Sequence, residues 1–131
     1  MRKWSHKECF DFFEVHPKNP RWSWSGRNED GSIVAVTLWK DLFTDGGRTY
    51  SNAAWVELDE WRSRPGFVEL IDNLCHARDH ALGIVRVILA TPKDPHAIPR
   101  SIDHCYPQEK LRMCVTSLDE QAGTFTLTRI G

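Results

Sequence analysis

Several features that would assign a function directly are missing from this chain of 131 residues. Its four cysteines, at positions 9, 75, 105 and 114, form no C-x-x-C pair, so we expect free thiols and a reduced compartment. No G-x-x-x-x-G-K-[ST] or G-x-G-x-x-G segment is present, and no G-x-S-x-G elbow presents a serine. We therefore expect neither a dedicated nucleotide-phosphate loop nor a serine hydrolase.

The chain also lacks an excess of charge of either sign and any long apolar run. It has 17 Lys and Arg against 18 Asp and Glu, so no general cationic field attracts nucleic acid. No stretch approaches the ~18 apolar residues of a membrane span, and no apolar segment of a secretory signal follows the N-terminus. We expect a cytoplasmic protein without a membrane partner. Any contact with nucleic acid must then rest on a local patch or a base pocket.

What the chain has in excess is tryptophan. The apolar fraction of 40% and the charged fraction of 27% are ordinary for a globular protein. The length predicts a single domain, residues 1–131, large enough to bury a core without disulfides or bound metals. However, six tryptophans in so short a chain are unusual, and five of them lie between positions 22 and 61.

Residues 22–39 predict a β-hairpin. Asp30-Gly31 separates two alternating runs, which favours a type I′ turn with positive φ at both central positions. This register places Trp24 opposite Thr37 and Trp22 opposite Trp39. One face then carries Trp22, Trp24, Ala35, Thr37 and Trp39, and the other carries Ser23, Ser25, Val34, Val36 and Leu38. The aliphatic face is expected to be core, whereas the tryptophan face is either a second core layer or a stacking platform.

One helix is predicted before this hairpin in the sequence and a second one after it. Ser5-x-x-Glu8 is a capping box that begins a short helix over about 6–14, with Phe10 and Phe13 on one stripe. Pro65 suits the first turn of a second helix that reaches about His80. Its apolar stripe repeats at i, i+3, i+4 and i+7 through Phe67, Leu70, Ile71, Leu74 and Ala77.

The remaining strands complete an α+β pattern. Residues 84–90 are apolar on both faces except for Arg86, which predicts a central strand. A further short strand is predicted in the run through Tyr50 and Trp55. Residues 91–110 hold four prolines and are predicted to be irregular, with at most a turn of helix near Ser101. Residues 111–117 and 124–130 predict a closing hairpin. The expected fold is α+β, with two helices and a bent, mostly antiparallel sheet or partial barrel.

The aromatic block predicts a binding surface. Aromatic rings offer faces on which a base stacks, and arginines add phosphate and cation–π contacts. The candidate ligand-binding residues are Trp22, Trp24, Arg27, Trp39, Arg48 and Trp55. The alternative is that the tryptophans belong to the core, since Trp is highly buried on average and acidic residues in the block match the basic ones.

The Trp-Ser-Trp-Ser hairpin and the Leu38-Trp39 run make the chain similar to short bacterial proteins, a resemblance that implies no activity. A bent sheet with aromatic residues and two helices resembles the PUA-like group of EVE, ASCH and YTH-type domains. Those domains cage a modified or flipped base between aromatic side chains, so the resemblance implies Trp22, Trp24 and Trp39 as cage residues. It rests on architecture, because no diagnostic motif of the group is present.

Histidine and cysteine residues provide a different hypothesis. His76 and His80 are four apart, a spacing at which two imidazoles on one helix face can hold a metal. However, Ala77 takes the place of the glutamate in H-E-x-x-H and no third ligand is matched, so we expect neither a metal nor a cofactor. His104 and Cys105 lie in the later proline-rich segment. If these groups met in space, a small hydrolytic enzyme would result.

Three functions remain open at this point. The first is a non-enzymatic binding module that recognises nucleic acid, or a modified base within it, through a pocket lined by Trp and Arg. The second is the hydrolytic enzyme, and the third is a protein-interaction domain whose exposed tryptophans are hot spots. A concave pocket lined by two or more tryptophans favours the first, converging His and Cys the second, and a flat aromatic patch the third.

Overall fold

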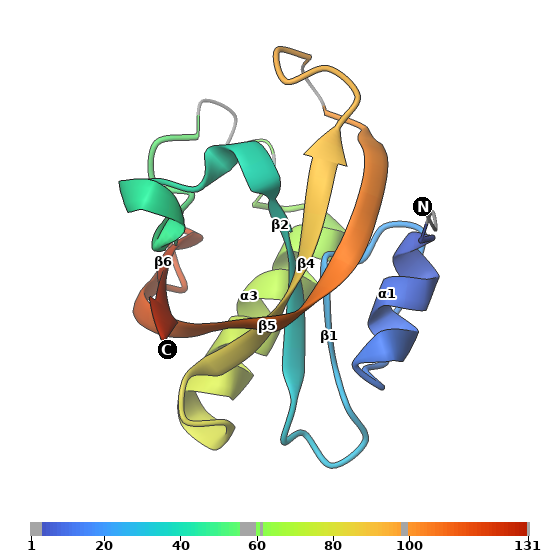
Figure 1. Ribbon diagram of the computed structural model, residues 1–131. Coiled ribbons are helices and arrows are strands. Elements are labelled where there is room, and N and C mark those ends of the chain that lie inside the picture. Colours follow the sequence, from blue (N-terminus) through green and yellow to red (C-terminus); the bar gives the residue numbers. More distant parts are fainter. Residues whose placement is uncertain (1–3, 56–59, 61, 98–99, 131) are drawn as a thin grey trace.

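The computed structural model describes residues 4–55, 60, 62–97 and 100–130, and it places a six-stranded sheet and two helices among them (Figure 1). In chain order these are α1 (His6–Phe12), β1 (Ser25–Arg27), β2 (Val34–Trp39), the 3-10 turns η1 (Lys40–Leu42) and η2 (Asp45–Gly47), β3 (Thr49–Ser51), α3 (Pro65–His80), β4 (Ile84–Pro92), β5 (Ile102–Asp119) and β6 (Thr124–Ile130). The sheet order is β1-β2-β4-β5-β6-β3. The predicted α+β fold with a bent, mostly antiparallel sheet is therefore confirmed.

One strand pair was not expected. β2 and β4 run parallel, whereas every other pair in the sheet is antiparallel. A parallel pair needs a crossover of a dozen or more residues, and the chain between β2 and β4 supplies one that contains α3. α3 covers one face of these two strands, and His6 of α1 contacts Thr37 on the other. Most residues of β2 and β4 are accordingly buried, which explains why residues 84–90 are apolar in both directions.

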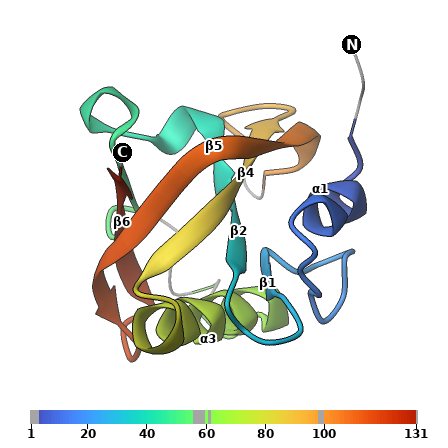
Figure 2. The ribbon, with the colours of Figure 1, turned by 60° about the horizontal axis from the view of Figure 1, so that its bottom comes forward.

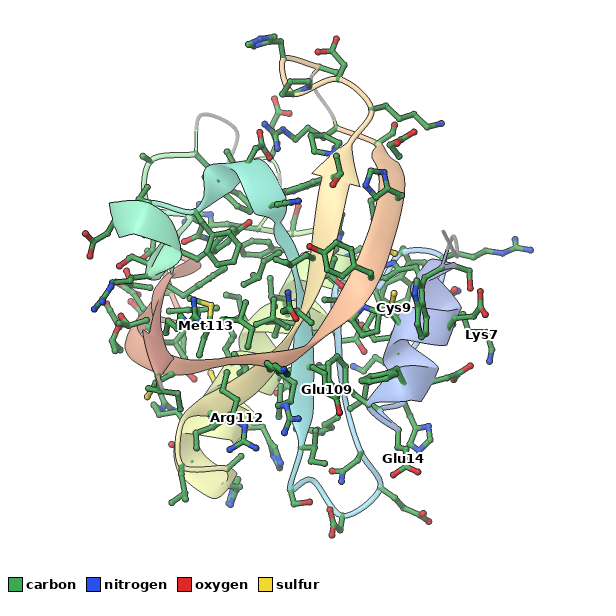
Figure 3. All side chains as sticks on the ribbon, in the orientation of Figure 1. Lys7, Cys9, Glu14, Glu109, Arg112 and Met113 are labelled. Carbon is green, nitrogen blue, oxygen red and sulfur yellow. The ribbon has the colours of Figure 1, made fainter. Side chains whose placement is uncertain are left out.

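The sheet bends strongly along β5. Its ladder with β4 shifts register between Arg86 and Val87, where Glu109–Leu111 lie between the paired residues of β5, and its ladder with β6 shifts at Thr116. Such bulges bend a strand and increase its twist. Figure 2 shows β5 arching beside β4 toward β6, with α3 across the inner side of this curve and α1 outside it. Met113 of β5 is accordingly fully buried, whereas its neighbour Arg112 is exposed (Figure 3).

The prediction of irregular structure over residues 91–110 is wrong, because β5 already begins at Ile102. No turn of helix forms near Ser101, whose carbonyl instead accepts a hydrogen bond from Lys93 N at 2.9 Å. Pro107 lies within the strand, opposite Ile88. Among the described strands only β4 pairs with this half of β5, since β6 joins from Arg112 onward. The other edge carries a single isolated bridge, between Cys105 and Trp4. A strand edge without a continuous ladder tolerates proline, because no ladder bond is lost there.

The hairpin register is confirmed over β1 and β2, but the turn type is wrong. Arg27 lies opposite Val34, and Thr37 N donates to Trp24 O at 2.8 Å. The loop spans four residues, 29–32, because Asn28 N donates to Ile33 O. Within it only Gly31 has a positive φ, of 75°. Asn28 Oδ1 and Asp30 Oδ1 accept loop N–H groups at 2.9 Å each, so side chains provide the turn geometry that was assigned to Asp30-Gly31.

Both faces of the hairpin are core at β2, whose six residues are all buried. Val34, Val36 and Leu38 are at most 1% exposed, so the aliphatic face is core as predicted. Val36 lies opposite Ser25, which is bonded to α3, so this face packs on that helix. On the other face, His6 of α1 is 2.7 Å from the Thr37 hydroxyl. The predicted pairing of Trp22 with Trp39 does not form, because Trp39 N donates to the Tyr50 hydroxyl at 3.2 Å.

The two serines of Trp-Ser-Trp-Ser connect the hairpin to α3. Ser23 Oγ donates to one carboxylate oxygen of Glu69, and Lys18 N donates to the other at 2.8 Å. Asn73 Nδ2 donates to Ser25 Oγ at 2.8 Å. Glu69 and Asn73 are four residues apart on the helix, a rise of about 6 Å. Ser23 and Ser25 are two residues apart in extended chain, a rise of about 6.8 Å. The spacing of the two helix residues therefore matches that of the two serines. We call this set of contacts, made by Lys18, Ser23, Ser25, Glu69 and Asn73, the serine seam.

The close contact at the serine seam also requires a glycine. A Cβ on Gly66, in the first turn of α3, would overlap the carbonyl oxygen of Trp22 and lie 3.1 Å from the Trp24 ring. The backbone of α3 at Gly66 therefore lies directly against the backbone of the extended chain at Trp22. This contact positions Trp24 beside the first turn of α3.

We predict that Ser23→Ala lowers the free energy of unfolding by about 1–3 kcal/mol, since a buried Glu69 oxygen loses its donor. The measurement is equilibrium urea denaturation. Ser101→Ala is the control, because Ser101 is exposed, and it should change stability by less than about 0.5 kcal/mol. Equal stability of the two variants would contradict the importance of the seam.

Candidate functional site

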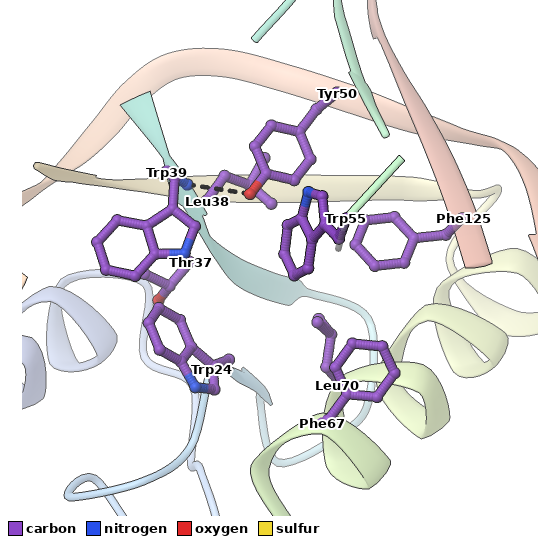
Figure 4. Close-up of a pocket in the computed structure, with 9 residues that line it drawn as sticks. All are labelled: Trp24, Thr37, Leu38, Trp39, Tyr50, Trp55, Phe67, Leu70 and Phe125. Atoms are coloured by element: carbon purple, nitrogen blue, oxygen red, sulfur yellow. Dashed lines mark hydrogen bonds between the residues drawn. The ribbon is translucent and has the colours of Figure 1, made fainter. Parts of the chain in front are cut away.

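An aromatic cavity lies along the C-terminal half of β2, where β1 begins. Beyond Trp24 none of the described strands pairs with this edge of β2, and side chains from other segments occupy the space (Figure 4). They enclose a cavity of about 40 Å³. Its lining comprises Trp24, Thr37, Leu38, Trp39, Tyr50, Trp55, Phe67, Leu70 and Phe125. Six of these nine are aromatic, and they come from segments far apart in the sequence. We call this site the aromatic cavity.

The inner wall of the aromatic cavity is fixed by packing. Tyr50, Phe67 and Phe125 are at most 4% exposed. The Tyr50 ring stacks on Phe125 with centroids 6.3 Å apart, and its hydroxyl accepts the Trp39 backbone N–H. Burial raises the pKa of Tyr50 well above its usual value, so the hydroxyl stays protonated. Trp24 and Trp55, in contrast, are half-buried, which makes them the residues at the mouth.

Trp39 is held between two partners. Its ring centroid is 5.3 Å from that of Trp24, with an interplanar angle of 53°. The Arg100 guanidinium lies 5.2 Å from the Trp39 ring centroid. Arg100 is itself held by Asp41, with two N–O distances of 2.8 and 2.7 Å, and it donates to Pro95 O at 2.9 Å. These hydrogen bonds lower the pKa of Asp41, so the carboxylate remains ionised beside the arginine.

The polar groups of the wall are mostly satisfied within the protein. His6 Nε2 is 2.7 Å from Thr37 Oγ1, and burial lowers the pKa of His6 to about 4, so the imidazole is neutral at pH 7. No described acceptor bonds the indole N–H of Trp24, Trp39 or Trp55. Figure 4 shows the Trp39 nitrogen on the cavity side of its ring. The site therefore offers an apolar space and indole donors.

Three of the predicted ligand-binding residues meet at the aromatic cavity and three do not. Trp24, Trp39 and Trp55 line it. Trp22 is 39% exposed and lies outside the lining. Arg27 faces Asp72 on α3, with an N–O distance of 3.6 Å. Arg48 is exposed beside β3, where its carbonyl accepts from Arg129 N at 2.7 Å. Neither arginine lines the cavity.

The sequence did not indicate Tyr50 and Phe125 as lining residues, nor Arg100, which contacts Trp39 from outside the lining. Tyr50 and Phe125 meet because β3 pairs with β6, a contact that no local pattern encodes. Arg100 lies in the segment that was predicted to be irregular. Phe67 and Leu70 were correctly assigned to the buried stripe of α3, but nothing in that stripe indicated that its first turn would close a cavity.

The His76 and His80 rings lie side by side, with centroids 5.0 Å apart, whereas Cys75 and Cys105 have other partners. Cys75 Sγ donates to Glu120 Oε1 at 2.7 Å, and burial together with this carboxylate raises the pKa of Cys75 to about 11. His76 Nε2 contacts Gly31 O at 2.8 Å. Cys105 lies on β5 with its sulfur 3.5 Å from that of Cys9. Within the described ranges no three metal-ligating side chains form a cluster. These contacts give the hydrolytic hypothesis no support.

Comparison of the chain with protein-family models, with curated proteins and with solved structures finds no match. Among the described helices, none has the length and apolar character needed to cross a membrane.

We predict that the protein loses stability as the pH falls from about 6.5 toward about 4, because His6 is held neutral in the folded state. Below pH 6.5 the unfolded chain takes up a proton that folded His6 takes up only near pH 4. The expected contribution is about 2 kcal/mol between pH 7 and pH 5. Urea denaturation across this range measures it.

The matched variants for this prediction are His6→Gln and His96→Gln. His6→Gln removes the titrating group and should reduce the pH dependence. His96 is exposed, so His96→Gln should keep the wild-type dependence. An unchanged profile for His6→Gln would refute the assignment.

Proposed function

We propose that the protein is a non-enzymatic binding module that recognises a modified base in single-stranded nucleic acid. The aromatic cavity is the recognition site. The observation that carries this proposal is a cavity of about 40 Å³ bounded by six aromatic rings, with half-buried Trp24 and Trp55 at its mouth. Aromatic side chains are the groups on which proteins stack unpaired bases.

The small volume of the cavity limits which part of a base can enter it. An apolar cavity that binds benzene measures about 150 Å³, so a space of about 40 Å³ does not take a whole base. It takes a methyl-sized substituent. In this arrangement the base ring stacks at the mouth against Trp24 and Trp55, and its alkyl group points inward toward Leu70 and Phe67.

The chemistry of the wall fits this division. The Thr37 and Tyr50 hydroxyls are engaged within the protein, so the interior favours an apolar group. Burying a methyl group contributes about 0.8 kcal/mol, which corresponds to roughly fourfold discrimination, and ring contacts add to it. The indole N–H groups can donate to acceptor atoms on the base edge.

The interaction-domain alternative has less support. Of the tryptophans in the described part of the chain, only Trp22 is exposed, while Trp4, Trp24 and Trp55 are half-buried and Trp39 is buried. A flat patch of several exposed tryptophans is therefore not formed by these residues.

We predict that short single strands with one N-methylated base quench tryptophan fluorescence and bind at least about fourfold more tightly than unmethylated strands of the same sequence. Trp24→Ala should weaken binding by about 1–3 kcal/mol, the cost of removing a stacking ring. Trp22→Ala is the matched control, since Trp22 lies outside the cavity lining and should leave the affinity unchanged.

Each variant is first shown to fold by its denaturation midpoint, and Trp24→Phe serves as a second variant that retains a ring. Two results would contradict the proposal. One is a folded Trp24→Ala variant that binds as well as the wild type. The other is a wild-type protein that binds no strand of a panel covering DNA, RNA and several methylated bases.

A further inference from the structure

A second concave site lies next to the aromatic cavity, between the η1–η2 segment and strands β5 and β6. It is a groove of about 430 Å³. Its lining consists of Lys40, Phe43, Gly47, Leu89, Gln108, Lys110, Leu111 and Arg129. The η1–η2 segment is the teal and green stretch between β2 and β3 in Figure 1. We call this site the cationic groove.

The bulge in β5 forms one side of the cationic groove. Lys110 and Leu111 are adjacent in sequence, so a regular strand would direct them to opposite faces. Both line the groove because they lie in the break between the residues that pair with Arg86 and Val87. Leu111 is buried and contributes to an apolar floor, whereas Lys110 is exposed at the rim. Gln108 and Lys110 share a face as in a regular strand, and the bulge brings Leu111 to the same side.

The charge of the groove is of one sign. Its lining contains three cationic residues and no carboxylate. Within the described residues, Lys40, Lys110 and Arg129 take part in no ion pair. The nearest carboxylate in sequence to Lys40 is Asp41, which is held by Arg100. In a chain of net charge −1, three unpaired cations in one groove are a local positive site.

Lys7, Arg27, Arg78 and Arg100 each face a carboxylate. Like the groove cations, Lys18, Arg48 and Lys93 take part in no ion pair among the described residues. What distinguishes Lys40, Lys110 and Arg129 is that they line one concave site together. They are available for an anionic ligand, and lysine and arginine are the usual partners of phosphate oxygens.

The groove and the aromatic cavity share a wall. Leu38 lines the cavity and pairs with Leu89, which lines the groove. Tyr50 of the cavity meets Phe43 of the groove edge to face, with centroids 5.0 Å apart. Lys40 directly follows Trp39 in the sequence. One layer of side chains therefore separates the two sites, and a single extended ligand can occupy both.

We propose that the cationic groove binds two or three consecutive phosphates of the strand whose modified base enters the aromatic cavity. This proposal rests on the proposed function. The groove contributes affinity that does not depend on base identity, whereas the aromatic cavity contributes discrimination. Lys40, Lys110 and Arg129 contact phosphate oxygens, and the apolar floor of Phe43 and Leu111 lies below the strand.

The test measures the salt dependence of binding for methylated and unmethylated strands. Each phosphate neutralised on a single strand contributes about −0.7 to the slope of log K against log salt, so three contacts predict a slope near −2. Lys110→Gln and Arg129→Gln should each make the slope shallower by about 0.7. Both should weaken the two strands equally, by about three- to tenfold, and leave the ratio between them unchanged.

Lys93→Gln is the control for net charge. Lys93 is exposed and lies outside the groove, the aromatic cavity and the serine seam, so this variant removes one positive charge without changing the slope. Denaturation midpoints verify that all three variants fold. If Lys110→Gln and Arg129→Gln behave like Lys93→Gln, the groove proposal is wrong even where the methylated strand still binds more tightly.

The outcomes separate the two proposals. A shallower slope in the groove variants without methyl discrimination in the wild type would retain the groove and overturn the modified-base function. Inorganic phosphate or a mononucleotide that competes as well as the strand would overturn the strand as occupant and assign the groove to a small phosphate ligand. A wild-type protein that binds no strand would overturn both.

Discussion

The structure depends on how a buried carboxylate is satisfied. Glu69 is 4% exposed, and its oxygens accept from the Ser23 hydroxyl and the Lys18 backbone N–H. A buried carboxylate without such donors would be strongly unfavourable. These bonds, with the contact at Gly66, fix the extended chain against α3 and thereby set where Trp24 lies. The serines of Trp-Ser-Trp-Ser provide the attachment, and the tryptophan between them lies beside the first turn of α3 and packs on Trp39.

The aromatic cavity forms because β1 pairs with only part of β2 and leaves one edge of β2 without a described partner strand beyond Trp24. An unpaired strand edge must be covered or satisfied. Here the Tyr50 hydroxyl accepts the Trp39 N–H in place of a neighbouring strand, and Trp55, Phe67 and Phe125 fill the space around it. The covering is incomplete, so a small apolar space remains. The cationic groove is separated from this space by one layer of side chains, in which Leu38 pairs with Leu89 and Tyr50 packs on Phe43. The apolar site and the groove lined by cations therefore lie side by side.

Local sequence signals predicted the local structure well. The capping box of α1, the bounds of α3 and the hairpin register depend on residues close in sequence, and they are confirmed. The parallel pairing of β2 with β4 and the path of β5 through Pro107 depend on contacts between distant segments, so periodicity could not reveal them. The same limit applied to the site. The Trp-rich block indicated Trp24, Trp39 and Trp55, but Tyr50 and Phe125 meet through β3 and β6, and Arg100 reaches Trp39 from a proline-rich segment.

The proposed function requires that the ligand occupies the aromatic cavity and not another tryptophan-rich surface. The most direct measurement is a two-dimensional ¹H–¹⁵N spectrum of the indole N–H groups, assigned by single Trp→Phe variants, during titration with a methylated single strand. The account predicts that the resonances of Trp24, Trp39 and Trp55 shift with a common saturation curve while that of Trp22 stays in place. A titration in which Trp22 shifts and these three do not would contradict it.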